Sequence, residues 1–223
     1  MKFTEAIANF SVTFREPLST FTELHRQVRE RLADLADVER KLAREAAAEG
    51  AAVDWGDGGF KNLLRGKPGP RGGLDASPIT MSAYLIAYLC DCPHYEAAAR
   101  MLEMFYAAPR EGACPQTGER RFGPAFAKVL GDAALFNKVV DVGVCAALGA
   151  AYLDFGDPEA DPWGLKPAPI RSLFTTPTFP YAPPGRYTIA HFYPATVRHV
   201  FERIQTVAPR AGRAPRKRRA LST

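Results

Sequence analysis

The chain has 223 residues, of which 47% are hydrophobic and 24% are charged, and it carries a net charge of +5. These proportions are typical of globular proteins and exclude a largely disordered chain. Six positive charges lie after residue 209, so residues 1–209 carry a net charge of −1 and are not basic as a whole. Any attraction to phosphate must therefore come from the C-terminal tail or from a local patch.

The first residues do not form an export signal, because Glu5 and Asn9 interrupt what would have to be its apolar region. The longest charge-free apolar stretch, residues 142–153, is shorter than the ~18 residues that a membrane span needs. Four cysteines are too few for a disulfide scaffold in a chain of this length. We therefore expect reduced thiols, no membrane span and a cytoplasmic location.

Residues 20–49 are predicted to form one long amphipathic helix that Gly50 ends. Charged residues lie between the apolar positions and form a mixed-charge face, which we interpret as solvent-exposed surface. The apolar positions recur at three- and four-residue steps. They are Phe21, Leu24, Val28, Leu32, Leu35, Val38 or Glu39, Leu42 and Ala46.

Residues 54–76 are predicted to form a loop, because glycine and proline recur throughout and leave room only for a short turn at 60–65. Between Asp57 and Asp75 this loop contains no acidic residue. It is therefore a local basic patch. Its cations are Lys61, Arg65, Lys67 and Arg71.

A buried helix is predicted to begin after Ser77-Pro78, since a serine caps a helix whose first position tolerates proline, and a nearly all-apolar run follows. A second helix begins at Pro93, and the two form a helical hairpin. After a polar loop at 111–121, a further helix is predicted over about 124–136. The inward-facing residues of the second helix are expected to be Tyr95, Ala98, Met101, Leu102 and Phe105.

Residues 139–144 and 152–155 are predicted to be two short strands, although a buried helix fits this apolar stretch almost as well. Residues 156–185 are rich in proline and aromatic side chains, and we expect an ordered extended crossing there. A further strand is predicted over 186–192, and a closing helix over 194–207.

These elements predict an α+β, helix-dominated fold. A helical region at 1–136, which contains the Gly/Arg-rich loop at 54–76, is followed by a small α+β region at 137–209 that packs on it. The second region holds a small antiparallel sheet and the closing helix. Residues 210–223 have no apolar periodicity and are expected to be a disordered basic tail.

Two sets of residues have the side chains of a chemical site. Cys90, Cys92, His94 and Cys114 are zinc-ligand types, but a single residue between paired cysteines is a poor spacing, so we expect no metal and no cofactor.

The second set would serve nucleophilic catalysis if the fold brought it together. It comprises Cys145, His191 and His199 with the acids Asp141 and Asp154. The sequence contains no phosphate-binding loop, dinucleotide fingerprint or nucleophile elbow. An enzyme is therefore the weakest of the interpretations.

The basic residues point to nucleic acid, because basic segments bind it by releasing condensed counterions. The segment 20–90, with a helix, a Gly/Arg loop and a capped helix, is loosely similar to winged helix-turn-helix regulators. That resemblance implies a helix in the major groove and a basic wing on neighbouring phosphates. The expected contacts are Lys61, Arg65, Lys67 and Arg71 in the loop and Arg210, Arg213, Arg216, Lys217, Arg218 and Arg219 in the tail.

Our hypothesis for function is a DNA-associated protein, regulatory or prophage-like, that binds the phosphate backbone through the basic loop and tail. The abundance of arginine over lysine, together with many alanines, is typical of bacterial genomes rich in G and C. The alternative is a non-enzymatic protein-interaction or assembly subunit that uses the proline- and aromatic-rich segment 163–193.

Overall fold

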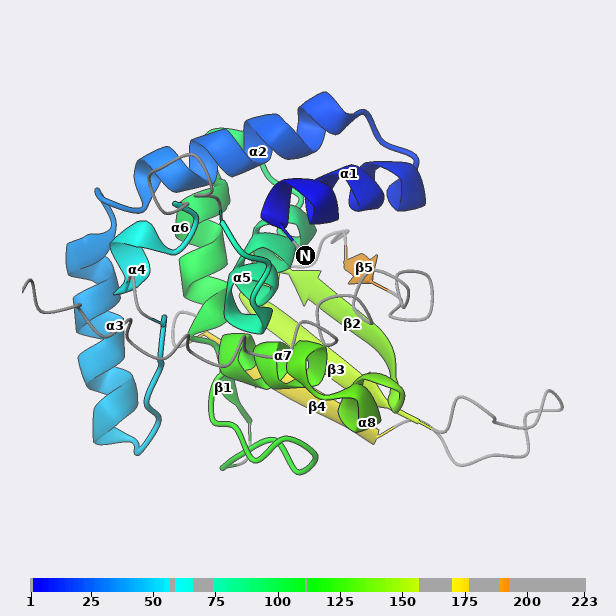
Figure 1. The fold of residues 1–223 in the computed structure, drawn as a ribbon. Coiled ribbons are helices and arrows are strands. Elements are labelled where there is room, and N and C mark those ends of the chain that lie inside the picture. Colours follow the sequence, from blue (N-terminus) through cyan, green and yellow to red (C-terminus); the bar gives the residue numbers. More distant parts are fainter. Residues whose placement is uncertain are drawn as a thin grey trace, which may run out of the picture.

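The computed structural model of the chain describes residues 2–56, 59–65, 74–110, 112–156, 170–176 and 189–192. Helices cover one face of a small antiparallel sheet (Figure 1), which confirms the predicted α+β, helix-dominated class. The described helices are α1 (Phe3–Phe14), α2 (Leu18–Arg31), α3 (Ala36–Ala48), α4 (Gly59–Asn62), α5 (Pro78–Leu89), α6 (His94–Phe105), α7 (Phe122–Gly131) and α8 (Ala133–Phe136). The strands are β1 (Ala108–Pro109), β2 (Val139–Cys145), β3 (Ala150–Phe155), β4 (Ile170–Thr175) and β5 (Ala190–Phe192).

Helix α1 was not predicted, and buried aromatic residues attach it to the other helices. Phe3 and Phe10 are both buried. The ring of Phe3 lies 4.9 Å from that of His25 on α2 and 5.0 Å from that of Tyr84 on α5, measured between centroids. Edge-to-face and tilted pairs of this kind add to the stabilisation that burial provides. Helix α1 is therefore part of the main core.

The prediction of one helix over 20–49 was wrong, because a turn at 32–35 separates α2 from α3. The turn contains neither glycine nor proline, and the Leu35 amide still bonds to the Arg31 carbonyl (3.2 Å). The two helices have different neighbours: α2 packs on α5 and α6, whereas α3 packs on α4. They also run in different directions (Figure 1). Tertiary packing, not a local breaker, therefore ends α2.

Helices α5 and α6 confirm the predicted hairpin. The Ser77 hydroxyl accepts a hydrogen bond from the Thr80 amide (3.2 Å) and caps α5, with Pro78 in its first turn. Pro93 precedes α6 as predicted. Tyr95 does not face inward, since it is 60% exposed. It lies in the first turn of α6, and a residue in the apolar row of a helix is buried only where another element covers that turn.

The helix predicted over 124–136 is also divided, into α7 and α8. Asp132 has an extended backbone (φ −120°, ψ 111°), and its carboxylate accepts hydrogen bonds from the amides of Ala134 (2.8 Å) and Leu135 (3.2 Å). Aspartate competes for backbone N–H groups and favours helix caps over helix interiors. Asp132 therefore ends one helix and caps the next.

The sheet has the order β1-β4-β3-β2-β5, and every neighbouring pair is antiparallel. The strands predicted over 139–144 and 152–155 are confirmed as β2 and β3. Strand β5 lies within the strand predicted over 186–192, whereas β1 and β4 were not predicted as strands. The closing helix expected over 194–207 and the basic tail lie outside the described residues.

Cross-strand partners show which side chains share a face of the sheet. Val142 pairs with Leu153, and both are fully buried against the helices. A β-bulge after Val139 turns that residue onto the same core face and leaves Asp141 on the other. We call this second face the polar face. Its residues are Asp141, Tyr152, Asp154, Arg171 and His191.

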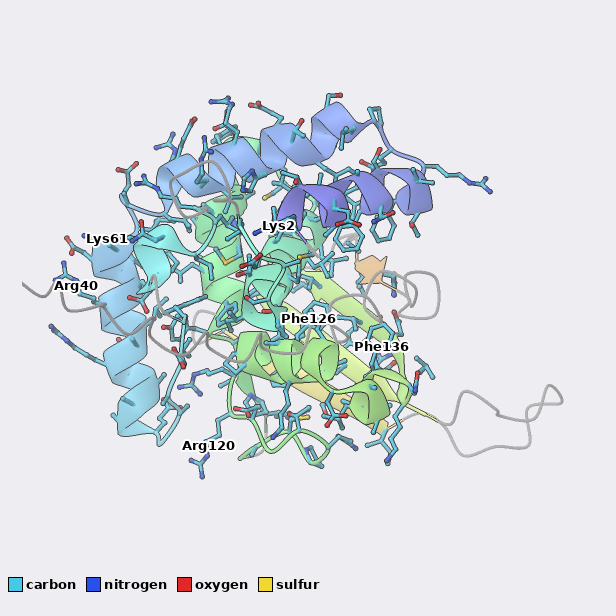
Figure 2. The ribbon with its side chains drawn as sticks, in the orientation of Figure 1. Lys2, Arg40, Lys61, Arg120, Phe126 and Phe136 are labelled. Atoms are coloured by element: carbon cyan, nitrogen blue, oxygen red, sulfur yellow. The ribbon has the colours of Figure 1, made fainter. Side chains whose placement is uncertain are left out.

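One continuous core joins the helices and the sheet. Leu32 after α2, Leu85 of α5, Phe126 of α7 and Phe174 of β4 are all fully buried in it. Figure 2 marks Phe126 together with Phe136 of α8, which belongs to the same cluster. Within the described ranges, every helix is too short or too polar to cross a bilayer.

Candidate functional site

Lys61 and Arg65 are the predicted nucleic-acid contacts that fall within the described residues, and both are exposed. The turn that carries them is anchored in the hydrophobic core by Phe60, Leu63 and Leu64, whose exposed fractions are 5% or less. The two cations thus project from an anchored segment. The other predicted contacts, Lys67, Arg71, Arg210, Arg213, Arg216, Lys217, Arg218 and Arg219, lie outside the described residues.

Most cations of α2 and α3 differ from these two because acidic residues lie within ion-pair distance of them. Arg26 contacts Glu23 (2.6 Å) and Glu30 (2.8 Å). Further pairs on the same helices are Arg31–Asp34, Arg40–Asp37 and Lys41–Glu45. Among the described residues, neither Lys61 nor Arg65 has such a partner. Lys61 and Arg65 are therefore exposed cations without an acidic partner among the described residues, a property that they share with Arg44 of α3.

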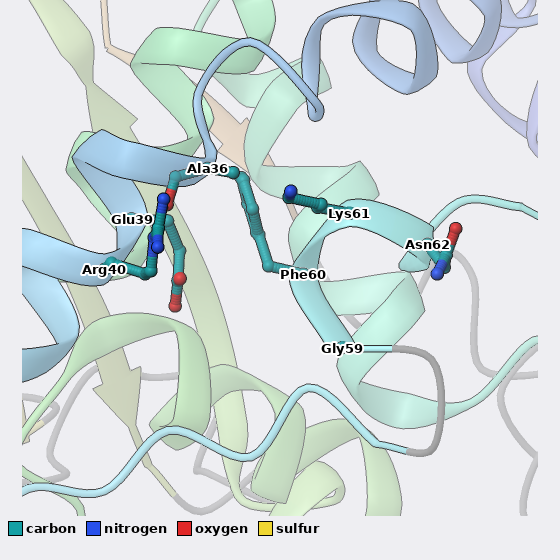
Figure 3. Close-up of a pocket in the computed structure, with 7 residues that line it drawn as sticks. All are labelled: Ala36, Glu39, Arg40, Gly59, Phe60, Lys61 and Asn62. Carbon is teal, nitrogen blue, oxygen red and sulfur yellow. The ribbon is translucent and has the colours of Figure 1, made fainter.

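A pocket of about 310 Å³ lies between α3 and α4, directly beside Lys61. In Figure 3 the ring of Phe60 projects from α4 toward α3, the Glu39 carboxylate lies on the α3 side of it, and Lys61 lies on the α4 side. The pocket thus combines an apolar wall with charged groups of both signs. Its lining residues are Ala36, Glu39, Arg40, Gly59, Phe60, Lys61 and Asn62.

Glu39 is a buried carboxylate, with an exposed fraction of 8%. Its Oε1 accepts hydrogen bonds from the Trp55 indole N–H (2.8 Å) and from the Tyr106 hydroxyl (2.8 Å). No described cation lies within ion-pair distance of it. Burial, followed by the hydrogen bond to Glu39, raises the pKa of Tyr106 well above its usual value, so the hydroxyl stays a donor. Two neutral donors therefore stabilise this carboxylate.

Asp141, Tyr152 and His191 meet on the polar face. The Tyr152 hydroxyl donates to Asp141 Oδ2 (2.8 Å), and His191 Nδ1 lies 3.0 Å from that oxygen and 2.9 Å from the hydroxyl. An ionised carboxylate only accepts, so the Nδ1 atom carries a proton in this arrangement. Burial, and then the hydrogen bond to Asp141, raise the pKa of Tyr152 well above its usual value. Tyr152 is therefore a donor at neutral pH.

Gly143 makes this contact possible. It pairs with Tyr152 across β3 and with His191 across β5. A Cβ atom at this position would lie 2.3 Å from the Tyr152 ring, which crosses β2 at this point. Asp141 and His191 were candidates from the sequence, whereas Gly143 and Tyr152 were not, because only the strand register brings them together.

Arg171 extends the network to β4. Its Nε and Nη2 atoms donate to the two oxygens of Asp154 (2.8 and 2.6 Å), and its guanidinium lies 4.1 Å from the centroid of the Tyr152 ring. Two carboxylates and one guanidinium give this face no excess positive charge, which does not suit a phosphate ligand. We therefore interpret the network as structural, because it links side chains on β5, β2, β3 and β4.

The remaining candidates for catalysis do not join this network. Cys145 is a buried thiol at the end of β2, and Asp154 is engaged in its ion pair. His199 lies outside the described residues. Of the residues considered for nucleophilic catalysis, the structure places His191 and Asp141 within hydrogen-bond distance of each other.

The zinc-ligand types are likewise separated. Cys90 and Cys92 follow α5, whereas Cys114 is buried beside Ser172 of β4, with 3.4 Å between Sγ and Oγ. Burial raises the pKa of both Cys90 and Cys92, which disfavours the thiolate that a metal needs. In the part of the chain that the structure describes, no three His, Cys, Asp or Glu side chains are placed to hold a metal ion.

No family model matches the chain, and no curated protein or solved structure matches it either. Within the segment 20–90, the described residues form α2 to α5. Of the loop at 54–76 that was expected to act as a basic wing, residues 57–58 and 66–73 lie outside the described ranges.

Proposed function

We propose that the protein binds nucleic acid through the phosphate backbone, with the basic loop and the basic tail as its contacts. The observation that supports this is the pair of exposed cations, Lys61 and Arg65, on a turn anchored by Phe60 and Leu64. Five cations of α2 and α3 lie within ion-pair distance of acidic residues, whereas these two, like Arg44 of α3, have no acidic partner among the described residues. Uncompensated, exposed positive charge on a fixed backbone is suited to phosphate.

The proposed contacts combine a fixed part with a separate tail. They are Lys61, Arg65, Lys67 and Arg71 with Arg210, Arg213, Arg216, Lys217, Arg218 and Arg219. Contacts to phosphates position a protein on DNA but carry no sequence information. We therefore infer a DNA-associated role in a bacterium, regulatory or prophage-like, in which the loop acts like the wing of a winged helix-turn-helix regulator.

Deletion of residues 210–223 tests the tail. Binding of the intact and shortened proteins to random-sequence duplex DNA is measured over a salt series. If all six cations contact phosphate, the slope of log affinity against log salt should fall in magnitude by about five. A shortened protein with unchanged affinity and slope would exclude the tail from the interface.

A charge-matched pair of variants tests the loop. Lys61→Ala with Arg65→Ala should reduce the slope by about two. Arg31→Ala with Lys41→Ala removes the same charge from residues that already face acids, and should change it less. An intact protein that does not bind DNA even at low salt contradicts the proposal.

The second candidate function is a protein-interaction or assembly subunit using 163–193. Its support is that two large apolar residues in the described parts of that segment are exposed. They are Ile170 (61%) and Ile189 (43%). An assembly detected by sedimentation, lost in Ile170→Asp and Ile189→Asp and formed by a protein that ignores DNA, would favour this function over the first.

A further inference from the structure

The carboxylate of Glu39 keeps hydrogen-bonding capacity beside the pocket between α3 and α4. Both described hydrogen bonds of Glu39 end on Oε1, from Trp55 and Tyr106. A carboxylate accepts at two oxygens, and a buried one is stabilised by every donor that it gains. Since Glu39 also lines the pocket, a ligand that offers N–H groups finds an acceptor there.

The other walls of the pocket specify the rest of the ligand. Phe60 and Ala36 supply an apolar surface, and Lys61 supplies positive charge, whereas Arg40, which also lines the pocket, is paired with Asp37. Figure 2 shows these two cations on the same side of the molecule. The ligand is therefore flat or apolar in its middle, rich in N–H donors at one end and anionic at the other. A nucleotide whose base carries an amino group has all three properties.

We propose that this pocket receives one unpaired base of a nucleic acid strand, whose amino group donates a hydrogen bond to the Glu39 carboxylate while a neighbouring phosphate lies at Lys61. The inference rests on the nucleic-acid binding proposed above and adds a base preference to it. Cytosine, adenine and guanine carry an exocyclic amino group. Thymine and uracil have no amino group, and their one ring N–H donor lies between two carbonyl oxygens, which a carboxylate repels. The strand is single, because a base within a duplex is already paired.

The test compares short oligomers of deoxycytidine and deoxythymidine of equal length at one salt concentration, by fluorescence anisotropy. Because both strands carry the same number of phosphates, counterion release contributes equally to the affinity for each of them. The intact protein should bind the cytosine strand about tenfold more tightly, which is the value of one hydrogen bond to a charged group. Equal affinity for the two strands overturns the inference.

Glu39→Gln is the informative variant. The glutamine oxygen still accepts from Trp55 and Tyr106, but its amide now donates toward the pocket, so the cytosine preference should vanish or reverse. Glu45→Gln is the matched control, since it removes the same charge from an exposed position on α3 outside the pocket. It should change both affinities alike and leave their ratio intact. A Glu39→Gln protein that keeps the wild-type ratio overturns the inference.

A second variant covers the case in which Glu39→Gln fails to fold. Ala36→Leu narrows the pocket from the α3 side and should abolish the preference while keeping the affinity for phosphate. For the wild-type protein, binding of both strands without preference rejects the base pocket alone, whereas failure to bind either strand or duplex DNA rejects the proposed function as well. Free deoxycytidine monophosphate that competes as well as the strand would reject the strand as the ligand.

Discussion

Gly143 has no side chain, and its position on β2 determines how Tyr152 lies. The Tyr152 ring, which comes from β3, occupies the space where a Cβ of Gly143 would stand. It therefore reaches Asp141 on β2 and His191 on β5. In a β-strand a glycine usually weakens the element, and it is kept where another group approaches closely. The approach here is that of an aromatic ring.

Gly143→Ala should therefore destabilise the protein by about 1–3 kcal/mol, because the added methyl group forces the Tyr152 ring to move. Urea unfolding measures the change. Combining it with Tyr152→Ala removes the clash, so the double variant should lose less stability than the sum of the two single variants. Additive losses would show that the ring is not what Gly143 accommodates.

The sequence identified Lys61 and Arg65 as candidate contacts, but it did not identify the buried carboxylate of Glu39, which lines the same pocket as Lys61. The apolar row of the predicted helix offered Val38 or Glu39, and chemistry alone favours valine inside. In the structure Val38 is 48% exposed and Glu39 is buried. Trp55 and Tyr106 supply the donors that make the burial possible, and Tyr106 lies 67 residues away in sequence. Periodicity does not reveal a partner at that distance.

At the scale of elements, His25 ties α2 to the segment after α4. Its Nε2 lies 3.2 Å from the Leu64 carbonyl, which only accepts, so the ring donates this hydrogen bond. The ring also packs on Phe3 of α1. Burial lowers the pKa of His25 below its usual value of 6.5, and the hydrogen bond to Leu64 opposes this only in part.

The lowered pKa makes stability depend on pH in a defined direction. Above pH 6.5 the ring is neutral in both states and its contribution to stability is complete. As the pH falls below 6.5 toward the folded-state pKa, the unfolded chain binds a proton that the folded chain does not, so the free energy of unfolding decreases. Urea unfolding of the wild type at pH 7.5 and 5.5 should show this loss.

His25→Gln separates this effect from other titrating groups. Glutamine keeps a donor for the Leu64 carbonyl but does not titrate, so the variant should lose less stability than the wild type over the same pH interval. The other three histidines, His94, His191 and His199, are present in both proteins and cancel in the comparison. Parallel losses would assign the pH dependence to groups other than His25.

Elements with local signals were predictable, and those that depend on packing were not. Ser77-Pro78 carries its own cap and start signal, so α5 begins where predicted. The break between α2 and α3 has no such signal, because it arises from the different neighbours of the two helices. Strand β4 was missed because proline on either side of it suggested an irregular crossing, whereas pairing with β3 makes it a strand.

At the scale of the whole molecule, one core joins α2 to α5 and to the sheet. Leu85→Asp should unfold the protein, since an unpaired buried carboxylate costs several kcal/mol, on the order of a domain's whole stability. Leu32→Asp should do the same from the end of α2. Val12→Asp, at a residue that is 79% exposed, is the control and should melt like the wild type. Wild-type melting temperatures for all three variants would show that α2 and α5 do not share one core.

The fold class was predictable because periodicity decides between helix and strand over long segments. The order of strands in the sheet was not, since it depends on which chain segments pair. The distribution of charge along the chain gave the basic loop, but its relation to a pocket required the packing of α4 against α3. The sequence thus indicated the charge of the proposed ligand, and the structure added the pocket that we propose for its base.

The hydrogen bond between Trp55 and Glu39 has an optical consequence. Indole fluorescence depends on the charge and polarity around the ring, and this indole donates directly to a carboxylate of the pocket while packing 4.2 Å from Phe105. The chain has two tryptophans, so a Trp163→Phe protein carries Trp55 as its only strong fluorophore. Its emission then reports what occupies the space beside Glu39, without a label and in the same sample used for unfolding.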